Sequence, residues 1–400
     1  MTSDVMFREA KNFFQVFEPK GEIISGIMIP GSVRILGDTS VLNKGKVIAG
    51  NLNKSAFIMA QKRRDGDRAV NFYSQRYDEK IRLSLNEPQS RQEHGWANFI
   101  ASTLFMLESM SKKVNGMNVY INNSIPDEFA ANSMEALEVG SAKISGRFSD
   151  WELENDELAD ICAQGEASFI GKEKDTVKYL PIIYGKTGAL TYLDLAKKDS
   201  RALETPMGDY VFLVFSSGVK KKQLEEKKNK IIEDVKDSLE KMKKNGFGDE
   251  GLESLTLEGF DDYRDKLTLV QRKRCAYFIS ENERVEKAMG LLQKKDFDGF
   301  AEVINESQKN IKNRLELVEE ENEILIDIIQ DSPEIKAVRL LNMGLDGTVL
   351  SLVLKEKRKA VETKIKKTFL SRTGLELKTE VFGLETEMRN LDIDVTEFNK

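Results

Sequence analysis

The sequence predicts a mixed α+β fold, in which strand-like and helix-like segments are interspersed. Three observations support this prediction. The chain has 400 residues, a length that corresponds to two or three domains. Short alternating apolar runs such as 69–74 are typical of strands, and apolar residues recurring every three or four positions, as in 96–110, are typical of helices. With 40% hydrophobic and 32% charged residues, the composition is that of an ordinary globular protein.

Composition also argues against several classes of function. The formal net charge of -6 gives no basic excess for binding nucleic acid. No apolar run approaches the roughly 20 residues that span a bilayer, and the start of the chain lacks the pattern of a secretory signal. The two cysteines, Cys162 and Cys275, fit a reducing compartment, so we expect a cytoplasmic protein without nucleic-acid or membrane partners. The single histidine, His94, argues against a histidine-based triad or a multi-histidine metal site.

The first half of the chain predicts mostly strands, after one helix with apolar spacing over 7–17. Turn residues at Pro30-Gly31 and at 51–53 separate apolar runs, so each is expected to end a strand. A long amphipathic helix follows over 96–110, and another helix over 156–169. The predicted strands are 22–29, 32–36, 46–52, 54–61, 69–74, 80–85, 116–122, 188–194 and 210–215, the last apolar enough for the centre of a sheet.

The second half predicts mostly helices. The segment 219–244 is rich in lysine and glutamate, which is typical of a helix with a solvated face, and Gly246 is a suitable residue to end it. Further helices are expected over 266–290, 296–329 and 357–372, the last ending at Gly374, before a final strand over 376–382 and a polar tail over 391–400.

The functional interpretation depends most on the stretch 31–50. It follows a strand-like run and a Pro-Gly turn, and then crosses a polar loop. It resembles the first signature of galactokinases, in the GHMP family of small-molecule kinases, which reads Pro-Gly-Arg-Val-Asn-Leu-Ile-Gly-Glu-His-Thr-Asp-Tyr-Asn-x-Gly. The matching residues are Pro30, Gly31, Val33, Gly37, Asn43 and Gly45, with Asp38 as a conservative match.

The resemblance implies that scaffold residues are kept while chemical residues have changed. The catalytic arginine of the family falls on a serine, and the aspartate that orients or deprotonates the sugar hydroxyl falls on a lysine, which is protonated unless its pKa is strongly lowered. The catalytic positions are thus held by Ser32 and Lys178, and the sugar-binding positions by Asp38, Thr39, Val41 and Lys228.

The segment 121–139 resembles the family's phosphate loop, Pro-x-Gly-Ala-Gly-Leu-Ser-Ser-Ser-Ala-x-Leu-Glu-Val. Glycines at such a strand-loop-helix junction let backbone N–H groups approach phosphates. Here Glu128 and Ala130 replace the loop glycines, and Glu135 adds negative charge that opposes a triphosphate. An ordinary capped helix without a ligand is the alternative interpretation. The nucleotide-binding positions are held by Asn132, Ser133, Met134 and Glu135, and the metal-side positions by Ser133 and Glu166.

Further matches extend the resemblance over nearly the whole chain. The segment 276–285 resembles the family run His-x-x-x-Glu-Asn-x-Arg-Val, and 337–353 resembles the third, glycine-rich signature, which closes over the active site. That closing loop includes Asn342, Met343 and Gly344. The resemblance implies a two-domain GHMP kinase fold: an N-terminal galactokinase-like domain over 1–208, similar to ribosomal protein S5 domain 2, and a ferredoxin-like GHMP kinase domain over 209–400. The ligand cleft is expected between them.

Three functions remain open. The family activity is ATP-dependent phosphorylation of galactose at the anomeric hydroxyl. The first hypothesis is a galactokinase-like protein that has lost this activity and acts as a sugar or metabolite sensor or a scaffold, with no tightly bound cofactor. The second is an active kinase for another small molecule, using Mg-ATP with Glu166, Ser133 and Asp38. The third is an interaction protein that binds a protein partner through the helix 219–244. Under the first hypothesis, we expect Lys178 to form an ion pair with Asp38 or Glu166.

Overall fold

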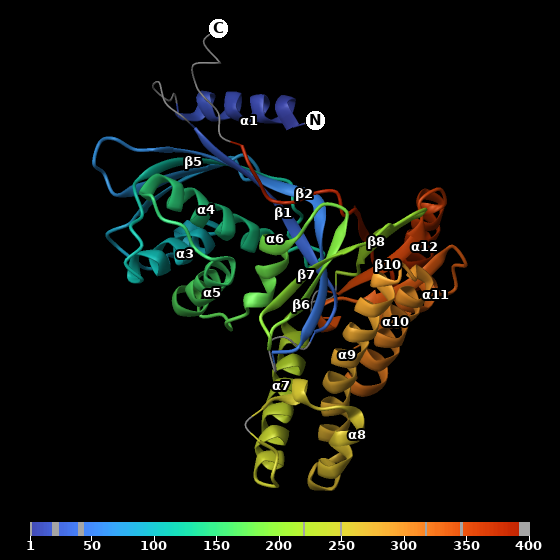
Figure 1. The fold of residues 1–400 in the computed structure, drawn as a ribbon. Helices are drawn as coiled ribbons and strands as arrows, with labels where there is room; N and C mark the ends of the chain where they lie inside the picture. The colour runs from blue at the N-terminus through green and yellow to red at the C-terminus, as the bar shows by residue number, and fades with distance from the viewer. Residues whose placement is uncertain are drawn as a thin grey trace.

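The structure, a computed structural model, describes residues 2–17, 24–38, 44–218, 221–248, 250–316, 318–344 and 347–391. Within these residues the chain forms two sheets and the helices that cover them (Figure 1). The larger sheet has eight strands among the described residues, in the order β12-β1-β2-β5-β3-β4, and β2 also pairs with β6, which pairs with β7. These strands are β1 (Ser25–Leu36), β2 (Lys46–Lys62), β3 (Ala69–Ser74), β4 (Glu79–Ser84), β5 (Met117–Asn123), β6 (Ala189–Asp194), β7 (Asp199–Glu204) and β12 (Arg389–Asn390).

The smaller sheet is antiparallel throughout, in the order β11-β8-β10-β9. The apolar strand β8 lies inside it, as its sequence predicts. Its strands are β8 (Tyr210–Ser216), β9 (Ile335–Leu340), β10 (Thr348–Leu354) and β11 (Lys378–Phe382). The helices of the chain are α1 (Thr2–Phe17), α3 (Ala97–Ser109), α4 (Ser133–Ser149), α5 (Asn155–Gly165), α6 (Leu180–Tyr184), α7 (Lys221–Lys243), α8 (Leu257–Phe260), α9 (Leu269–Gln293), α10 (Phe297–Asn310), α11 (Glu320–Gln330) and α12 (Arg358–Thr373).

The two longest strands, β1 and β2, correct the expected boundaries. The sequence predicted four strands here, with turns at Pro30-Gly31 and at 51–53, but the structure has two continuous strands paired from Ser25↔Ala60 to Leu36↔Ile48. Pro30 lies at a register shift, where a missing N–H is tolerated. Asn51 is buried opposite Ser32 inside the ladder. Pro30 and Asn51 therefore both lie inside strands and do not end them.

Other boundaries also differ from those predicted. The strand β7 was not predicted. The expected helix over 296–329 is divided: α10 ends in a π-helical turn, Ile311–Leu315, after which Glu316 takes a left-handed conformation with φ 57°. The helix α5 likewise ends in a π-helical turn, Glu166–Ile170. Gly374 ends α12 with φ 74°, as predicted. The predicted tail over 391–400 lies outside the described residues beyond 391.

The larger sheet is covered on both faces. Helix α4 packs on one face, against β1 and β2, and α3 packs against α4 (Figure 1). Because side chains alternate along a strand, Ile58 joins this core while Met59 points to the opposite face, where α1 covers it with Phe13. The same core continues into α9 and α10, so the helices of the second half help to enclose the first sheet.

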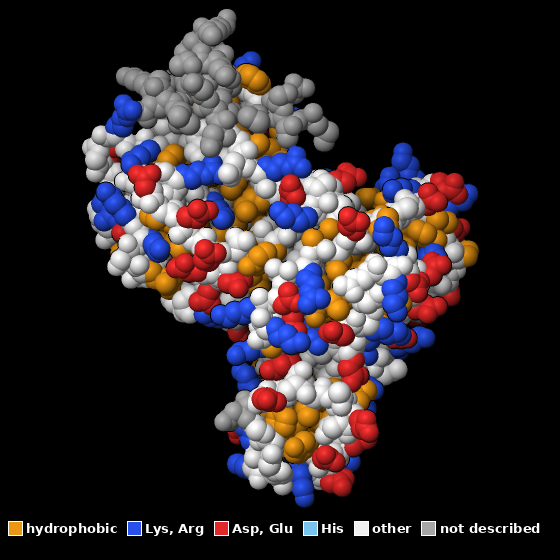
Figure 2. All heavy atoms as spheres, viewed as in Figure 1, with side chains coloured by type: hydrophobic (Ala, Val, Ile, Leu, Met, Phe, Trp, Pro, Cys, Tyr) orange, Lys and Arg blue, Asp and Glu red, His pale blue; other side chains and the backbone are white. Residues whose placement is uncertain are grey.

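The strands of the larger sheet come from 25–204 and 389–390, and those of the smaller sheet from 210–382. The expected domain boundary at 208 falls between these sets, although β12 returns to the first sheet; the division itself stays a prediction. Helix α7 projects from the body together with α8 (Figure 1), and on the displayed face acidic and basic side chains are mixed (Figure 2). No helix among the described residues is long and apolar enough to cross a bilayer.

Candidate functional site

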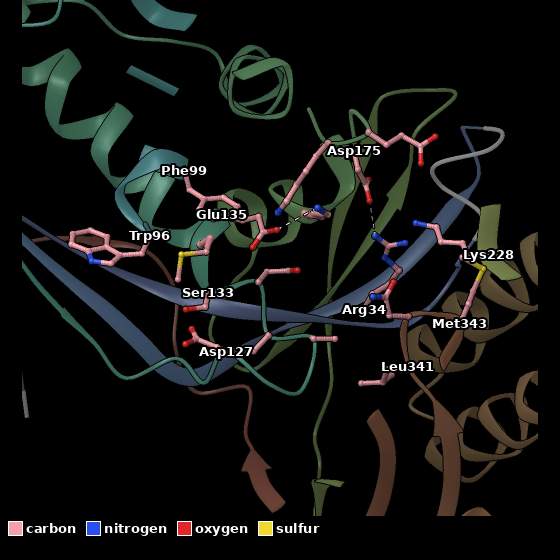
Figure 3. Close-up of a pocket in the computed structure, with 18 of the residues that line it drawn as sticks. Arg34, Trp96, Phe99, Asp127, Ser133, Glu135, Asp175, Lys228, Leu341 and Met343 are labelled. Carbon is pink, nitrogen blue, oxygen red and sulfur yellow. Dashed lines mark hydrogen bonds and ion pairs between the residues drawn. The ribbon is translucent and has the colours of Figure 1, made fainter. Parts of the chain in front are cut away.

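A cavity of about 660 Å³ lies where the first sheet, α4, α7 and the loop after β9 meet (Figure 3). It brings together many of the residues singled out from the sequence, although they are far apart in the chain. Lining it are Asn132, Ser133, Met134, Glu135, Lys178, Lys228, Asn342 and Met343. Ser32, Asp38 and Glu166 are buried close to this region but do not line the cavity. Thr39 and Val41 lie outside the described residues.

The loop before α4 is fastened to strand β1. The Asn132 side-chain amide donates to Ser32 Oγ at 3.0 Å, and the Ser32 backbone N–H donates to the Ala131 carbonyl at 3.1 Å. A Cβ on Gly31 would stand 2.6 Å from the Ala131 carbonyl oxygen, so this approach requires glycine. Ser32 is therefore a buried hydrogen-bond partner of the loop, where the resemblance expects a catalytic cation.

Both loops that are glycine-rich in the family have left-handed backbone at residues other than glycine. Ala130 stands at a family glycine position with φ 51°, and Phe129 beside it has φ 70°. In the closing loop, Asn342 and Met343 have φ 47° and 51°. Left-handed backbone costs an ordinary side chain about 1–2 kcal/mol, so the surrounding packing must hold these loops in place. Gly344 ends the closing turn, and Asp346 lies outside the described residues.

Lys178 forms the ion pair that the sequence predicted. It ends a short 3₁₀ turn, Thr176–Lys178, and its ammonium lies 3.5 Å from Glu166 Oε2 and 3.5 Å from Glu135 Oε1. Of the two partners considered, Glu166 is confirmed and Asp38 is not. Burial lowers the pKa of Lys178, but the charges of Glu135, Glu166 and Asp175 outweigh burial and hold that pKa above its ordinary value. Lys178 is therefore a cation and cannot accept a proton.

The residues at the expected metal position do not fit Mg²⁺ in this arrangement. Glu166 is almost fully buried, and each of its oxygens faces an ammonium group, Lys172 at 3.0 Å and Lys178 at 3.5 Å. Ser133 Oγ accepts from the Asn123 amide at 2.9 Å. Mg²⁺ needs oxygen ligands that are not already neutralised. The part of the chain that the structure describes also has no group of three or more histidine, cysteine, aspartate or glutamate side chains placed to hold a metal.

Behind the cavity, Glu138 is fully buried. Tyr179 Oη donates to its Oε2 at 2.9 Å, and Thr103 Oγ1 at 3.1 Å. Burial raises the pKa of Glu138 well above its usual range, and the negative charges of Glu166 and Glu135 raise it further. The raised pKa favours the protonated form of this carboxyl, which accepts hydrogen bonds from Tyr179 and Thr103 in the core.

Asp38, the surviving carboxylate of the sugar signature, belongs to a buried ionic network. It pairs with Arg339 of β9 and accepts from Tyr277 Oη of α9 at 3.3 Å. Arg339 also lies 3.2 Å from Glu281, which accepts from the Gly37 backbone N–H at 3.1 Å. The network fastens the end of β1 to both α9 and β9. In the described structure Asp38 holds the halves of the chain together and does not line the cavity.

Sequence reasoning missed Arg34. It stands two residues after Ser32 on the same strand, so both side chains share one face. Its guanidinium lines the cavity and lies 3.4 Å from Asp175 Oδ2 (Figure 3). The period-2 alternation of a strand could have found it, because the residue at i+2 of a site position faces the same space. An aromatic end of the cavity was also missed, in which Tyr77 and Trp96 stack with ring centroids 6.0 Å apart.

Comparison with known proteins shows relatives that match nearly the whole chain. The galactokinase of Staphylococcus saprophyticus is 24% identical over 368 residues, which are 91% of this chain and 94% of that protein. The crystal structure of Lactococcus lactis galactokinase complexed with galactose superposes with a TM-score of 0.88 at 20% identity, covering 96% of this chain and 99% of that one. Methanococcus jannaschii mevalonate kinase superposes with a TM-score of 0.61 at 16% identity, covering 90% and 98%.

No model of a known protein family matches the chain. The shared architecture confirms the predicted GHMP kinase fold of α and β elements. Relatives of this kind match over about nine tenths of the chain, and the structural superposition covers nearly all of it. The chain is therefore similar to galactokinases over nearly its whole length and shares the fold of the GHMP small-molecule kinases.

Proposed function

We propose that this galactokinase-like protein binds a small metabolite in the cavity without phosphorylating it, and acts as a sensor or a scaffold. The observation that carries the proposal is the Lys178 ammonium held between Glu135 and Glu166. The resemblance puts the proton acceptor of a sugar kinase at this position. An ammonium has three donors and no acceptor, so it cannot take the proton of a sugar hydroxyl.

Three further features support loss of phosphoryl transfer. Ser32 supplies no charge where the family has its catalytic arginine. The phosphate loop is hydrogen-bonded to Ser32 through Asn132. Glu166 is neutralised by two lysines. Phosphoryl transfer depends on positioning and on charge neutralisation, and the loss of one electrostatic donor can cost on the order of 10²–10³ in rate. Several losses together leave little activity.

The same features support weak or absent binding of Mg-ATP. The resemblance places Glu128 and Glu135 at the phosphate loop and Asp346 at the closing loop, where their charges would oppose a triphosphate. Glu135 stands in the first turn of α4 and lines the cavity. Glu128 pairs with Lys378 at 2.5 Å, which holds the pKa of Glu128 below its usual range and offsets its charge. Asp346 lies outside the described residues. The expectation therefore now rests on Glu135, whose charge Lys178 offsets in part at 3.5 Å.

A second candidate function, an active kinase for another small molecule, is favoured by one observation. Arg34 and Asp175 form an ion pair of 3.4 Å on the wall of the same cavity. An arginine and an aspartate are the residue types that the family uses for catalysis, here displaced by a few positions. In this case Asp175 would accept the proton of the substrate hydroxyl and Arg34 would stabilise the transferring phosphoryl group.

One experiment distinguishes these functions. The purified chain is incubated with Mg-ATP and a panel of neutral, acidic and phosphorylated sugars, and ADP release is followed. The thermal unfolding of the chain is measured with each sugar in parallel, since a ligand that binds the native state raises the melting temperature. A sugar that raises the melting temperature without ADP release supports the proposal. Sugar-dependent ADP release contradicts it, and its loss in Asp175→Asn would support the second candidate.

An absence of any effect would favour the third hypothesis, an interaction protein. The described part of α7 is consistent with a solvated face, in which Lys230 lies 2.8 Å from Glu233 and 3.4 Å from Asp234. Such exposed pairs contribute little to stability. A pull-down with the whole chain and with a variant carrying serines on this face would then test whether α7 binds a protein.

A further inference from the structure

Two cationic side chains line the end of the cavity away from the aromatic residues. Arg34 comes from β1 and Lys228 from α7, and Figure 3 shows the Lys228 chain extending toward the Arg34 guanidinium. Two cations at the same end of a cavity repel each other unless an anion lies between them. What balances these two cations therefore indicates what the cavity can bind.

The described residues supply one carboxylate to this pair of cations. Asp175 accepts from Arg34 through Oδ2, while its Oδ1 accepts the backbone N–H of Val177. Lys228 is half-buried and makes no hydrogen bond or ion pair with any residue that the structure describes. Glu173 lines the rim of the cavity, but it is exposed and forms no described ion pair with either cation. Within the described residues, Asp175 is thus the one carboxylate that pairs with either of these two cations.

Arg34 also has hydrogen-bonding capacity to spare. A guanidinium carries five N–H donors in a fixed fork, and within the described residues Arg34 makes one hydrogen bond, of 3.4 Å, to Asp175. Its side chain is only 16% exposed, so water satisfies the remaining donors poorly. A planar fork and a nearby ammonium are the groups that bind carboxylates and phosphates best.

Building on the proposed function, we infer that the ligand of this cavity carries an oxyanion, a phosphate or a carboxylate, which lies between Arg34 and Lys228. The class of ligand is then a phosphorylated or carboxylated monosaccharide. In the first galactokinase signature quoted above, the position of Arg34 is a neutral asparagine, which suits a neutral sugar. The cavity volume of about 660 Å³ is ample for a sugar with one such group.

Calorimetric titration tests this inference with four probes: galactose, galactose 1-phosphate, galacturonate and inorganic phosphate. We expect at least one acidic sugar to bind about tenfold more tightly than galactose, as one charge-assisted contact would provide, and its affinity to fall as salt is raised. The phosphate and the carboxylate probes distinguish the two sources of the oxyanion. Inorganic phosphate serves as a probe of the anion site that does not depend on which sugar is correct.

The variant Lys228→Gln should lower the affinity for the acidic sugar and for phosphate about tenfold. Lys227→Gln is the matched control, because Lys227 precedes Lys228 on the same helix but pairs with Glu319 and does not line the cavity. Lys228 makes no described hydrogen bond or ion pair, so we expect the variant to have the same melting temperature as the wild type. The variant Arg34→Gln gives a second test of the same anion site.

Several outcomes would overturn the inference. These are equal affinities for galactose and the acidic sugars, absence of binding by all anionic probes, or an unchanged affinity in Lys228→Gln. Tight binding of galactose without ADP release would overturn the oxyanion site and leave the proposed function standing. Phosphorylation of an acidic sugar would support the oxyanion site and refute the proposed loss of catalysis.

Discussion

Asn132 donates a hydrogen bond to Ser32 and so joins the loop before α4 to the strand that passes beneath the cavity. By the resemblance, Asn132 stands at a phosphate-loop position and Ser32 at the position of the catalytic arginine. A charged guanidinium at position 32 and a glycine-rich loop at 128–130 would not form this contact. The proposed loss of activity therefore predicts a repacked site and not a single missing group.

Restoring the missing aspartate alone should not restore a kinase. We expect Lys178→Asp to give no galactose phosphorylation, because Ser32 remains uncharged and the loop stays bound to it. The new carboxylate would also lie among Glu135 and Glu166 without the ammonium that compensates them, so we expect lower stability as well. ADP release and thermal unfolding are the measurements, with Lys178→Met as the control that removes charge without adding a base. Robust turnover from the single variant would refute the repacked site.

Binding of Mg-ATP should be weak or absent, because Glu135 faces the cavity and Glu166 has no free oxygen for the metal. Calorimetry with Mg-ATP, repeated with EDTA, measures this directly. Glu135→Gln removes the repelling charge and should strengthen any nucleotide binding, while Glu240→Gln, on the distant end of α7, should not. A micromolar dissociation constant that requires Mg²⁺ in the wild type would contradict this prediction.

Glu138→Gln should stabilise the protein at neutral pH. The folded-state pKa of Glu138 is raised by burial, so the folded protein keeps a proton that the unfolded chain loses above about pH 4. The stability linked to this group is fully present below that pH and declines as the pH rises toward the folded-state pKa. Glutamine stays neutral at every pH and can keep hydrogen bonds to Tyr179 and Thr103.

The gain in melting temperature from this variant should therefore be absent near pH 4 and grow toward pH 7. Glu128→Gln is a control that should change the melting temperature in the opposite direction, because Lys378 holds the pKa of Glu128 below its usual value. Its ion pair contributes above the unfolded pKa and is lost as the pH falls. A destabilised Glu138→Gln protein at pH 7 would show that Glu138 is charged in the folded state.

Ala130→Gly should be neutral or stabilising, although glycine usually costs about 0.5–1 kcal/mol relative to alanine. The reason is that Ala130 has φ 51°, a conformation that costs alanine about 1–2 kcal/mol. The neighbouring Ala131 is not among the residues with positive φ and is buried, so Ala131→Gly should lose roughly 1 kcal/mol or more. Chemical denaturation of both variants gives the comparison. If the two glycines cost the same, the loop backbone is not strained at 130.

Much of the site follows from the sequence, for identifiable physical reasons. The pairing of Lys178 with Glu166 was predictable because a lysine inside a cleft needs a carboxylate, and few carboxylates were near it. The choice between Glu166 and Asp38 was not, because Arg339, distant in sequence, binds Asp38. Arg34 was missed since the signature was compared residue by residue and the alternation of the strand was not used.

In the fold, too, local features were predictable and features that depend on residues distant in sequence were not. Short strands such as β3 were predicted to the residue, because their alternating pattern is local. The continuity of β1 and β2 was not predicted, because Pro30 and Asn51 are turn-forming residues that the long ladder accommodates at a bulge and inside the core. The left-handed backbone of Ala130 and Met343 could not be read from residues that rarely adopt it.

The short strand β12 has a consequence for the order of folding. Its residues pair with β1, as Ile27↔Asn390 and Met28↔Arg389, and so bring together two ends of the described chain. During synthesis β1 emerges long before β12, and its edge stays open meanwhile; an open strand edge is a template for pairing with other chains. Contacts of such long sequence separation slow folding. Until β12 is made, this edge of the first sheet is therefore a place where the nascent chain can pair wrongly.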